Sequence, residues 1–357
     1  MPETALLTTH RPRRVYLAEP NGYCAGVYMA VKALVWMVQI FDNPVYCYHE
    51  IVHNRFVVES FERAGVVFVD SVNEVPEGAP VMLSAHGSAP QVVEDGEKRA
   101  GIVIDAVCPL VAKVHHEVKR RAAKGFDIIF VGHVGHDEAL GTVARAPSNI
   151  TLVEPETGLA GFRPSDPRKV ALFAQTTLGM HEWEAIRAEA SGRYQNLETS
   201  RKSDLCYATT NRQDAVLQMS AECDLILVVG SDNSSNTNAL VRTARMQTAA
   251  YRIDSADSIR PEWLETADVV GITAGASAPD HLVQEVLDHL DPVEGWSLYR
   301  VTEEDEYFPL PPGLRSLLNA LVSTVRIGFA APSNGQGPLD YDRQVTATDA
   351  LAMLEGA

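Results

Sequence analysis

Short apolar segments that suit β-strands alternate along the chain with longer segments that carry apolar residues at helical spacing. Strands are predicted at residues 14–19, 45–48, 81–84, 102–104, 128–131, 170–174, 225–229 and 269–273. Helices are predicted at residues 26–40, 54–64, 110–124, 181–190, 211–221, 236–247 and 279–290. This alternation is typical of an α/β protein whose sheets are mostly parallel.

Three cysteines, Cys24, Cys108 and Cys206, lie at similar junctions, where an apolar strand is followed by a helix. Their separations are each close to the length of one small α/β unit. We therefore expect three similar units around a central axis, each contributing one cysteine, at residues 14–108, 109–205 and 206–292. Residues 1–13 form an N-terminal extension in this interpretation, and residues 293–357 a C-terminal extension without identifiable chemistry.

The three junctions favour a shared metal site. A helix N-terminus carries unpaired N–H groups and partial positive charge, so we expect it to lower the pKa of a thiol there. The alternative is that each cysteine is a small buried hydrophobe, and we assign that role to Cys47 and Cys223, which lie within or beside apolar strands. Three thiolates fit either zinc with water as fourth ligand or an iron–sulfur cluster with one open iron. The absence of C-x-x-C pairs and the long separations favour the cluster.

The composition of the chain indicates a globular protein and argues against several classes of partner. The chain has 357 residues, 46% of them hydrophobic and 22% charged, as in ordinary globular proteins. A formal charge of −17 argues against nucleic acid as a partner. No apolar stretch reaches the length of a membrane helix, so we expect no membrane association. Five cysteines without regular spacing indicate a reducing compartment, and we predict a cytoplasmic protein.

Polar, donor-rich segments follow most of the predicted strands, where ligands of parallel sheets gather. They include four histidines, His53, His86, His133 and His136, each of which could also be a simple hydrogen-bonding or capping group. Neutral donors follow two later strands and could bind phosphate oxygens despite the negative net charge: Ser234, Ser235, Asn236 and Ser277. For residues 234–236 the alternative is helix capping alone.

Glu138 is the candidate proton donor. It stands in a predicted loop with His133 and His136, where apolar surroundings would raise the pKa of its carboxyl group. A histidine or threonine could pass it a proton. The alternative is an ordinary solvated glutamate at the surface.

Nine segments, in order from about Arg14 to Leu290, closely resemble the 4-hydroxy-3-methylbut-2-enyl diphosphate reductase family. In this chain they read NGYCAGV (21–27), HEIVHNR (49–55), SAHG (84–87), DAVCPLV (105–111), GHVGHDE (132–138), QTTL (175–178), CYATTNRQ (206–213), GSDNSSN (230–236) and TAGASAPD (273–280). The resemblance implies three small α/β units with mostly parallel sheets arranged around a central iron–sulfur site.

The resemblance also implies an activity and roles for named residues. The family removes the allylic hydroxyl of its substrate with two electrons and two protons, which yields isopentenyl and dimethylallyl diphosphates. Its [4Fe–4S] cluster would have three thiolate ligands, Cys24, Cys108 and Cys206, and one open iron. Glu138 would donate a proton and Thr176 would help to position it or the substrate hydroxyl. The diphosphate would be held by His53, His86, His136, Ser234, Ser235, Asn236 and Ser277. A ferredoxin or flavodoxin would supply the electrons.

The chain departs from the family pattern at four positions. Asp137 stands where proline is usual and Leu140 where a second glutamate is usual, which changes the loop of Glu138 in shape or charge. Asn21 replaces arginine, and Val107 replaces threonine. Two rival functions remain from the residues alone: a three-cysteine zinc hydrolase acting on a phosphorylated substrate, and an iron–sulfur sensor that binds a diphosphate.

Overall fold

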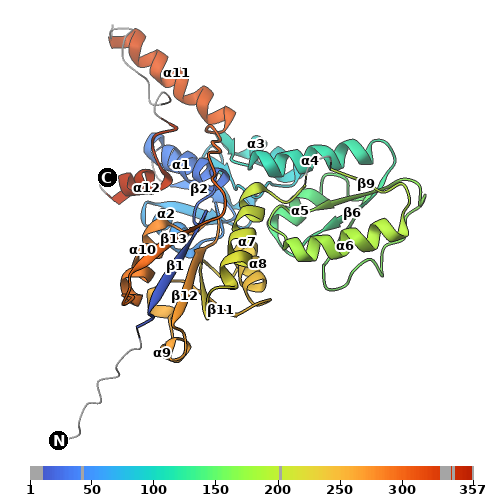
Figure 1. The fold of residues 1–357 in the computed structure, drawn as a ribbon. Helices are drawn as coiled ribbons and strands as arrows, with labels where there is room; N and C mark the ends of the chain where they lie inside the picture. The colour runs from blue at the N-terminus through green and yellow to red at the C-terminus, as the bar shows by residue number, and fades with distance from the viewer. Residues whose placement is uncertain (1–10, 42–43, 201–202, 330–338, 340–341, 356–357) are drawn as a thin grey trace, which may run out of the picture. The chain divides into compact units, whose positions relative to one another are not determined.

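Three parallel sheets with helices packed on them account for most of the described chain in the computed structural model (Figure 1). The structure describes residues 11–41, 44–200, 203–329, 339 and 342–355. Most of the predicted N-terminal extension and part of the predicted C-terminal extension lie outside the described residues. The predicted α/β class and the predominance of parallel sheets are confirmed.

The chain divides into two compact bodies. The single-sheet body comprises the described parts of Met1–Tyr23, Gly179–His181 and Tyr207–Glu304. The two-sheet body comprises the described parts of Cys24–Leu178, Glu182–Cys206 and Asp305–Ala357. All three predicted ligand cysteines belong to the two-sheet body.

The single-sheet body contains five strands in the order β11 (Ala249–Ile253), β10 (Leu225–Val229), β12 (Val269–Ala274), β1 (Arg14–Glu19) and β13 (Trp296–Arg300). Its helices are α7 (Tyr207–Ser220), α8 (Ser235–Ala244), the short α9 (Pro261–Leu264), α10 (Asp280–Leu290) and the 3₁₀ turn η2 (Ala256–Ser258). Figure 1 shows α7 and α8 side by side against this sheet. The residues of β10 are all buried because helices cover the sheet, which explains the unbroken apolar sequence of this strand.

Strand β1 lies between β12 and β13, with Arg14 opposite Val269 and Val15 opposite Trp296. Residues 14–19 therefore lie in a sheet whose other strands come from residues 225–300. This pairing joins segments that the sequence pattern had assigned to different α/β units.

The two-sheet body contains two four-stranded sheets. One has the order β3 (Val66–Val69), β2 (Val45–Tyr48), β4 (Pro80–Leu83) and β5 (Ile102–Asp105), and the other β7 (Ile150–Val153), β6 (Asp127–Val131), β8 (Val170–Ala174) and β9 (Glu198–Thr199). Helices α1 (Ala25–Ile40), α2 (Arg55–Arg63), α3 (Pro90–Arg99), α4 (Pro109–Ala122) and α5 (Asp137–Val143) follow the strands, with the 3₁₀ turn η1 (Val72–Glu74). Helix α6 (Met180–Arg193) belongs to this body except for its first two residues.

Every predicted strand and helix is present, with ends that differ by a few residues. The short strands β3, β7, β9, β11 and β13 and the helices α3, α5 and α9 were not predicted. The placement of Glu138 in a loop is wrong, because this residue lies in the first turn of α5.

The chain after residue 304 is more structured than its sequence indicated. It forms α11 (Pro312–Phe329) and α12 (Ala347–Glu355), and α12 packs against α1 and α2. The ammonium group of Lys32 in α1 is buried, 2.9 Å from Oδ1 of Asp342, and donates to the carbonyl of Asp342 at 2.6 Å. Tyr307 donates a hydrogen bond to the same carboxylate. None of the helices in the described ranges is long and apolar enough to cross a membrane.

Candidate functional site

The three predicted ligand cysteines lie at helix starts. Cys24 is the N-cap of α1, Cys108 is the N-cap of α4, and Cys206 directly precedes α7. None of the three forms a disulfide bond, and all three are half-buried. The junction pattern seen in the sequence is therefore present in the structure for Cys24 and Cys108, which follow β1 and β5.

Gly26 shows how close two of these thiols lie. A Cβ atom added at Gly26 would lie 2.8 Å from Sγ of Cys108 and 3.8 Å from Sγ of Cys24. Both sulfur atoms therefore border one small space that only glycine leaves open. The Cys24 and Cys206 thiols are also near enough to Cys108 to raise its pKa. The structure thus brings the three cysteines together.

The expectation that helix N-termini would lower the thiol pKa is wrong for Cys108. Backbone N–H groups of Leu110 and Val111 do favour its thiolate, as predicted. Burial outweighs them, and the pKa of Cys108 lies well above its ordinary value. A bound cation would reverse this balance, since a metal-coordinating thiol is deprotonated.

The other two cysteines fit the alternative role. Cys47 in β2 is fully buried, and Cys223 is 7% exposed beside β10. Burial raises the pKa of both thiols, that of Cys223 to about 12. Both act as small hydrophobic residues, as predicted.

Arg212, in α7, was not singled out in the sequence although it lies in one of the nine segments. Its guanidinium is 1% exposed and donates to the carbonyl of Gly22 at 3.0 Å, two residues before Cys24. It also pairs with Glu304 at 2.9 Å. Arg212 therefore ties the loop that leads into Cys24 to the helix that follows Cys206.

Glu138 is fully enclosed, with its side chain fixed by one residue. The Thr176 N–H donates to Oε1 at 2.7 Å, and the Thr176 hydroxyl donates to Oε2 at 2.8 Å. Burial raises the pKa of Glu138 to about 7, although both donors from Thr176 oppose the shift. The carbonyl of Thr176 accepts from the N–H of Cys206 at 3.1 Å, so one residue joins the acid to a cysteine.

Three of the predicted histidines form one group in the two-sheet body. The rings of His53 and His86 stack at 3.9 Å, and His136 meets them edge-on at 5.2 and 5.9 Å. Burial lowers the pKa of His86 well below its ordinary value and that of His136 to about 3. The Glu138 N–H donates to Nδ1 of His136, so Nε2 carries the proton of this neutral ring. His133 is not part of this group. Its backbone N–H donates a hydrogen bond to the side-chain oxygen of Gln175.

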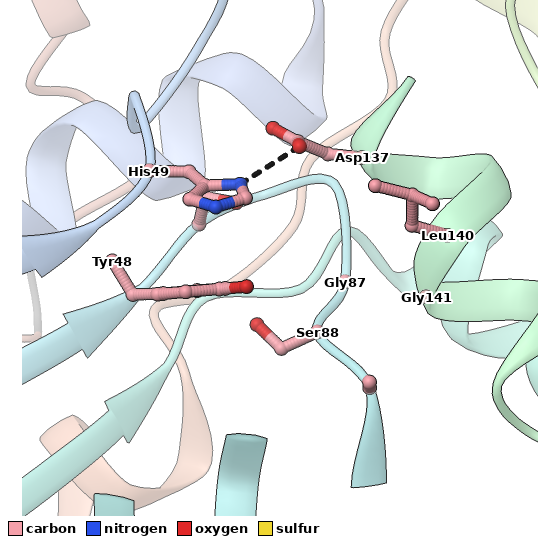
Figure 2. Close-up of a pocket in the computed structure, with 9 residues that line it drawn as sticks. Tyr48, His49, Gly87, Ser88, Asp137, Leu140 and Gly141 are labelled. Atoms are coloured by element: carbon pink, nitrogen blue, oxygen red, sulfur yellow. Dashed lines mark hydrogen bonds and ion pairs between the residues drawn. The ribbon is translucent and has the colours of Figure 1, made fainter. Parts of the chain in front are cut away.

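A further histidine, His49, lies beside this group and was not proposed from the sequence. Its Nδ1 is 2.7 Å from Oδ1 of Asp137, and its φ of 57° is unusual for a residue other than glycine. Figure 2 shows this bond at a small cavity of about 40 Å³ that Tyr48 and Ser88 also line. The bond to Asp137 raises the pKa of His49. Burial alone would raise the pKa of Asp137, but His49 and the neighbouring imidazoles lower it on balance.

His53, His86 and Asp137 offer ligand atoms within 4.8 Å of one another, which raises the question of a metal ion. The two imidazoles are stacked and nearly parallel, at 12°, so their in-plane nitrogen lone pairs lie in separate parallel planes and do not converge on one point. This arrangement suits two N–H donors to neighbouring oxygens of one anion better than it suits two ligands of one metal.

The predicted serine and asparagine donors form a group in the single-sheet body. Ser234 is the N-cap of α8 and accepts from the Thr237 N–H, which confirms the capping role. Asn236 accepts from the Ala276 N–H at 2.9 Å, which joins the start of α8 to the loop of Ser277. Ser234, Asn236 and Ser277 are all buried. The dipole of a helix start favours an anion here.

Comparison with known proteins identifies the family. Residues 15–291 match the family model described as LytB protein. The chain belongs to the LytB family. The resemblance seen in the nine segments is confirmed.

Relatives of this LytB-family chain align with most of its length. A Streptomyces avermitilis protein and a Bordetella bronchiseptica protein, both called 4-hydroxy-3-methylbut-2-enyl diphosphate reductase, are each 46% identical to it. The alignments cover 88% and 84% of this chain and 94% and 93% of the relatives. A solved Plasmodium falciparum structure, described as E-1-hydroxy-2-methyl-but-2-enyl-4-diphosphate reductase, has a TM-score of 0.84 at 31% identity. It covers 87% of this chain and 99% of its own.

Proposed function

We propose that this chain reduces 4-hydroxy-3-methylbut-2-enyl diphosphate to isopentenyl diphosphate and dimethylallyl diphosphate, the final step of the non-mevalonate isoprenoid pathway. Two electrons and two protons remove the allylic hydroxyl as water. Membership of the LytB family and the names of its relatives support the substrate. The observation that carries the proposal is the enclosed acid Glu138, joined through Thr176 to the backbone of Cys206.

The cysteines are the proposed ligands of an iron–sulfur cofactor. Three sulfur donors converge in the two-sheet body, and the remaining cysteines are buried as hydrophobic residues. We therefore assign Cys24, Cys108 and Cys206 to a [4Fe–4S] cluster with one open iron. When bound, such a cluster supplies electrons and a Lewis-acidic iron.

Glu138 is the proposed catalytic acid. A pKa of about 7 leaves a large share of its carboxyl groups protonated at neutral pH, whereas an ordinary glutamate would be ionised. Thr176 holds both carboxyl oxygens, so the proton is presented in one orientation. Protonation of the substrate hydroxyl by Glu138 converts it into water, which is a good leaving group.

The diphosphate is the proposed ligand of the residues to which the family resemblance assigns it. These are His53, His86, His136, Ser234, Ser235, Asn236 and Ser277. Most of these donors are neutral, which is how a chain with a net charge of −17 can accept an anionic substrate.

A reduced ferredoxin or flavodoxin is the proposed electron donor. We also place the reaction in the cytoplasm, where cysteines that form no disulfide stay reduced.

Anaerobic purification followed by metal analysis and an activity assay tests this function. We expect a brown protein with iron and acid-labile sulfide, and loss of the allylic hydroxyl that depends on a reduced viologen dye. A colourless protein with one zinc per chain would favour the zinc hydrolase instead. An iron–sulfur protein that binds the diphosphate without turnover would favour the sensor.

A further inference from the structure

Asp137 lies between two imidazoles. Its Oδ1 is 2.7 Å from Nδ1 of His49, and its Oδ2 is 3.7 Å from Nδ1 of His86. The carboxylate is the first residue of α5, directly after His136, and is 18% exposed. Asp137 therefore lies next to the histidine group to which we assign the diphosphate.

The Nδ1 atom of His86 is buried and has no hydrogen-bond partner in the described structure. Its distance of 3.7 Å to Asp137 is longer than a hydrogen bond, yet a shift of well under 1 Å would form one. A buried nitrogen beside a carboxylate is stable only as an N–H donor, because a bare lone pair there would face negative charge.

The pairing of Nδ1 with Asp137 determines which protonation state of His86 can bind an anion. A phosphate oxygen needs an N–H, and the free ring nitrogen of His86 is Nε2. A neutral imidazole has only one N–H, so it cannot serve both Asp137 and the anion. An imidazolium has two and serves both.

The surroundings of His86 set the resting state of the free protein. It is faced by His53, His136, His49 and Asp137. Burial and the three other imidazoles keep His86 neutral while no anion is present. His49 and Asp137 form a close pair at 2.7 Å, in which each residue shifts the pKa of the other toward its charged form.

We propose that Asp137 is a positioning residue that makes His86 take up a proton when the diphosphate binds. The Asp137 carboxylate then receives the Nδ1–H of His86 while the Nε2–H binds a phosphate oxygen. This inference rests on the proposed function, because it takes the histidine group to be the diphosphate site. The inference goes beyond that function by proposing that diphosphate binding is accompanied by uptake of one proton, and that this uptake depends on the Asp137 carboxylate.

Calorimetry of inorganic diphosphate binding to the cluster-loaded protein tests the proposal. Titrations under argon in Hepes and in Tris, which differ in ionisation enthalpy, give the number of protons taken up. Asp137→Asn and Asp137→Pro both remove the carboxylate, and proline is well tolerated at the first position of a helix. The matched control is Asp166→Asn, which removes a carboxylate that pairs with Arg168 in a surface turn.

We expect wild type and Asp166→Asn to take up about one proton more than either Asp137 variant between pH 7 and 8. Both Asp137 variants should bind diphosphate about tenfold more weakly, the change that one unit of histidine pKa produces. The protonation of diphosphate itself is common to all four proteins and cancels in the comparison. A visible spectrum equal to that of wild type checks that the cluster site is intact.

Two results would contradict the inference while leaving the reductase function in place: equal proton uptake in all four proteins, or tighter binding once Asp137 is replaced. Tighter binding would mean that the carboxylate only repels the anion. Failure of the wild-type protein to bind diphosphate at all would overturn both this inference and the proposed function.

Discussion

Asp137 and Glu138 are adjacent in the chain, yet their surroundings shift the pKa of the two carboxyl groups in opposite directions. Asp137 faces imidazoles, which favour its charged form. Glu138 is enclosed, and no cation among its described neighbours offsets burial. One turn of helix thus presents a permanent carboxylate and a carboxylic acid, and such a pair is a recurrent arrangement at sites of proton transfer.

Replacement of Glu138 by glutamine keeps the size of the side chain but removes its acidic proton. We expect turnover to fall about 10²- to 10⁴-fold, the usual contribution of general acid catalysis. Iron and sulfide content should stay at the wild-type level, because Glu138 is not a proposed ligand. Glu184→Gln, at an exposed position of α6, is the control for the loss of a carboxylate. Turnover of Glu138→Gln within twofold of wild type would contradict the assignment.

The raised pKa of Glu138 predicts a pH dependence. Its acid form predominates below pH 7 and is lost as pH rises through about 7, so the rate should fall up to tenfold per pH unit above that value. Initial rates with reduced viologen between pH 6 and 8.5 would measure this limb. The residual rate of Glu138→Gln should lack it, and the same limb in that variant would assign the titration to another group.

At the scale of elements, the site is assembled from helix starts. Helices α1 and α4 begin directly after Cys24 and Cys108, and α5 begins after His136. A short loop follows each strand, and the helix that comes next fixes the position of the residue at the junction. The close approach of α1 to Cys108 depends on Gly26.

Gly26→Ala should affect the metal site more than the fold. The added methyl group would lie 2.8 Å from Sγ of Cys108, and the thiol can avoid it by rotating away from its position. We expect iron and sulfide content to fall by half or more, while thermal unfolding of the metal-free protein changes little. Gly192→Ala in α6 is the matched control, because a Cβ there meets nothing within 4 Å. Equal iron content in both variants would show that Gly26 has no part in the site.

The local part of this architecture could be predicted from the sequence, because turn residues and helix starts depend on neighbouring residues. Cys24 and Cys108 stand where the pattern placed them. The raised pKa of Cys108 could not be predicted in this way, since it depends on burial by residues distant in the chain. The same limit applies to β1, whose partners β12 and β13 lie more than two hundred residues further along. The helical position of Glu138 could not be predicted because α5, with 7 residues, is too short to show a helical pattern in the sequence.

At the scale of the whole molecule, the segment after residue 304 is part of the fold. It lies beyond the family match, which ends at residue 291, and yet it neutralises a buried charge of the core. Lys32 is 4% exposed in a helix that begins at a proposed cofactor ligand. Without Asp342 this ammonium group would have no carboxylate among its described contacts.

Asp342→Ala should therefore destabilise the protein by about 3–5 kcal/mol, the usual result of leaving one member of a buried pair alone. Chemical denaturation of the metal-free protein would measure the change. The double variant Lys32→Met with Asp342→Leu removes both charges and should recover most of the loss. Asp305→Asn, which breaks an exposed pair with Arg343, is the control. A loss below 1 kcal/mol in Asp342→Ala would indicate that the tail is not needed to hold Lys32.

The spacing of Cys24, Cys108 and Cys206 has a consequence for the unfolded chain. A cofactor held by all three would act as a cross-link that closes two loops of roughly ninety residues each, and the polymer model of such links gives about 4–5 kcal/mol per loop. Oxidative loss of iron would then release both links at once. A chain damaged in this way would unfold more readily and become a substrate for proteases, so that inactive copies are cleared rather than retained.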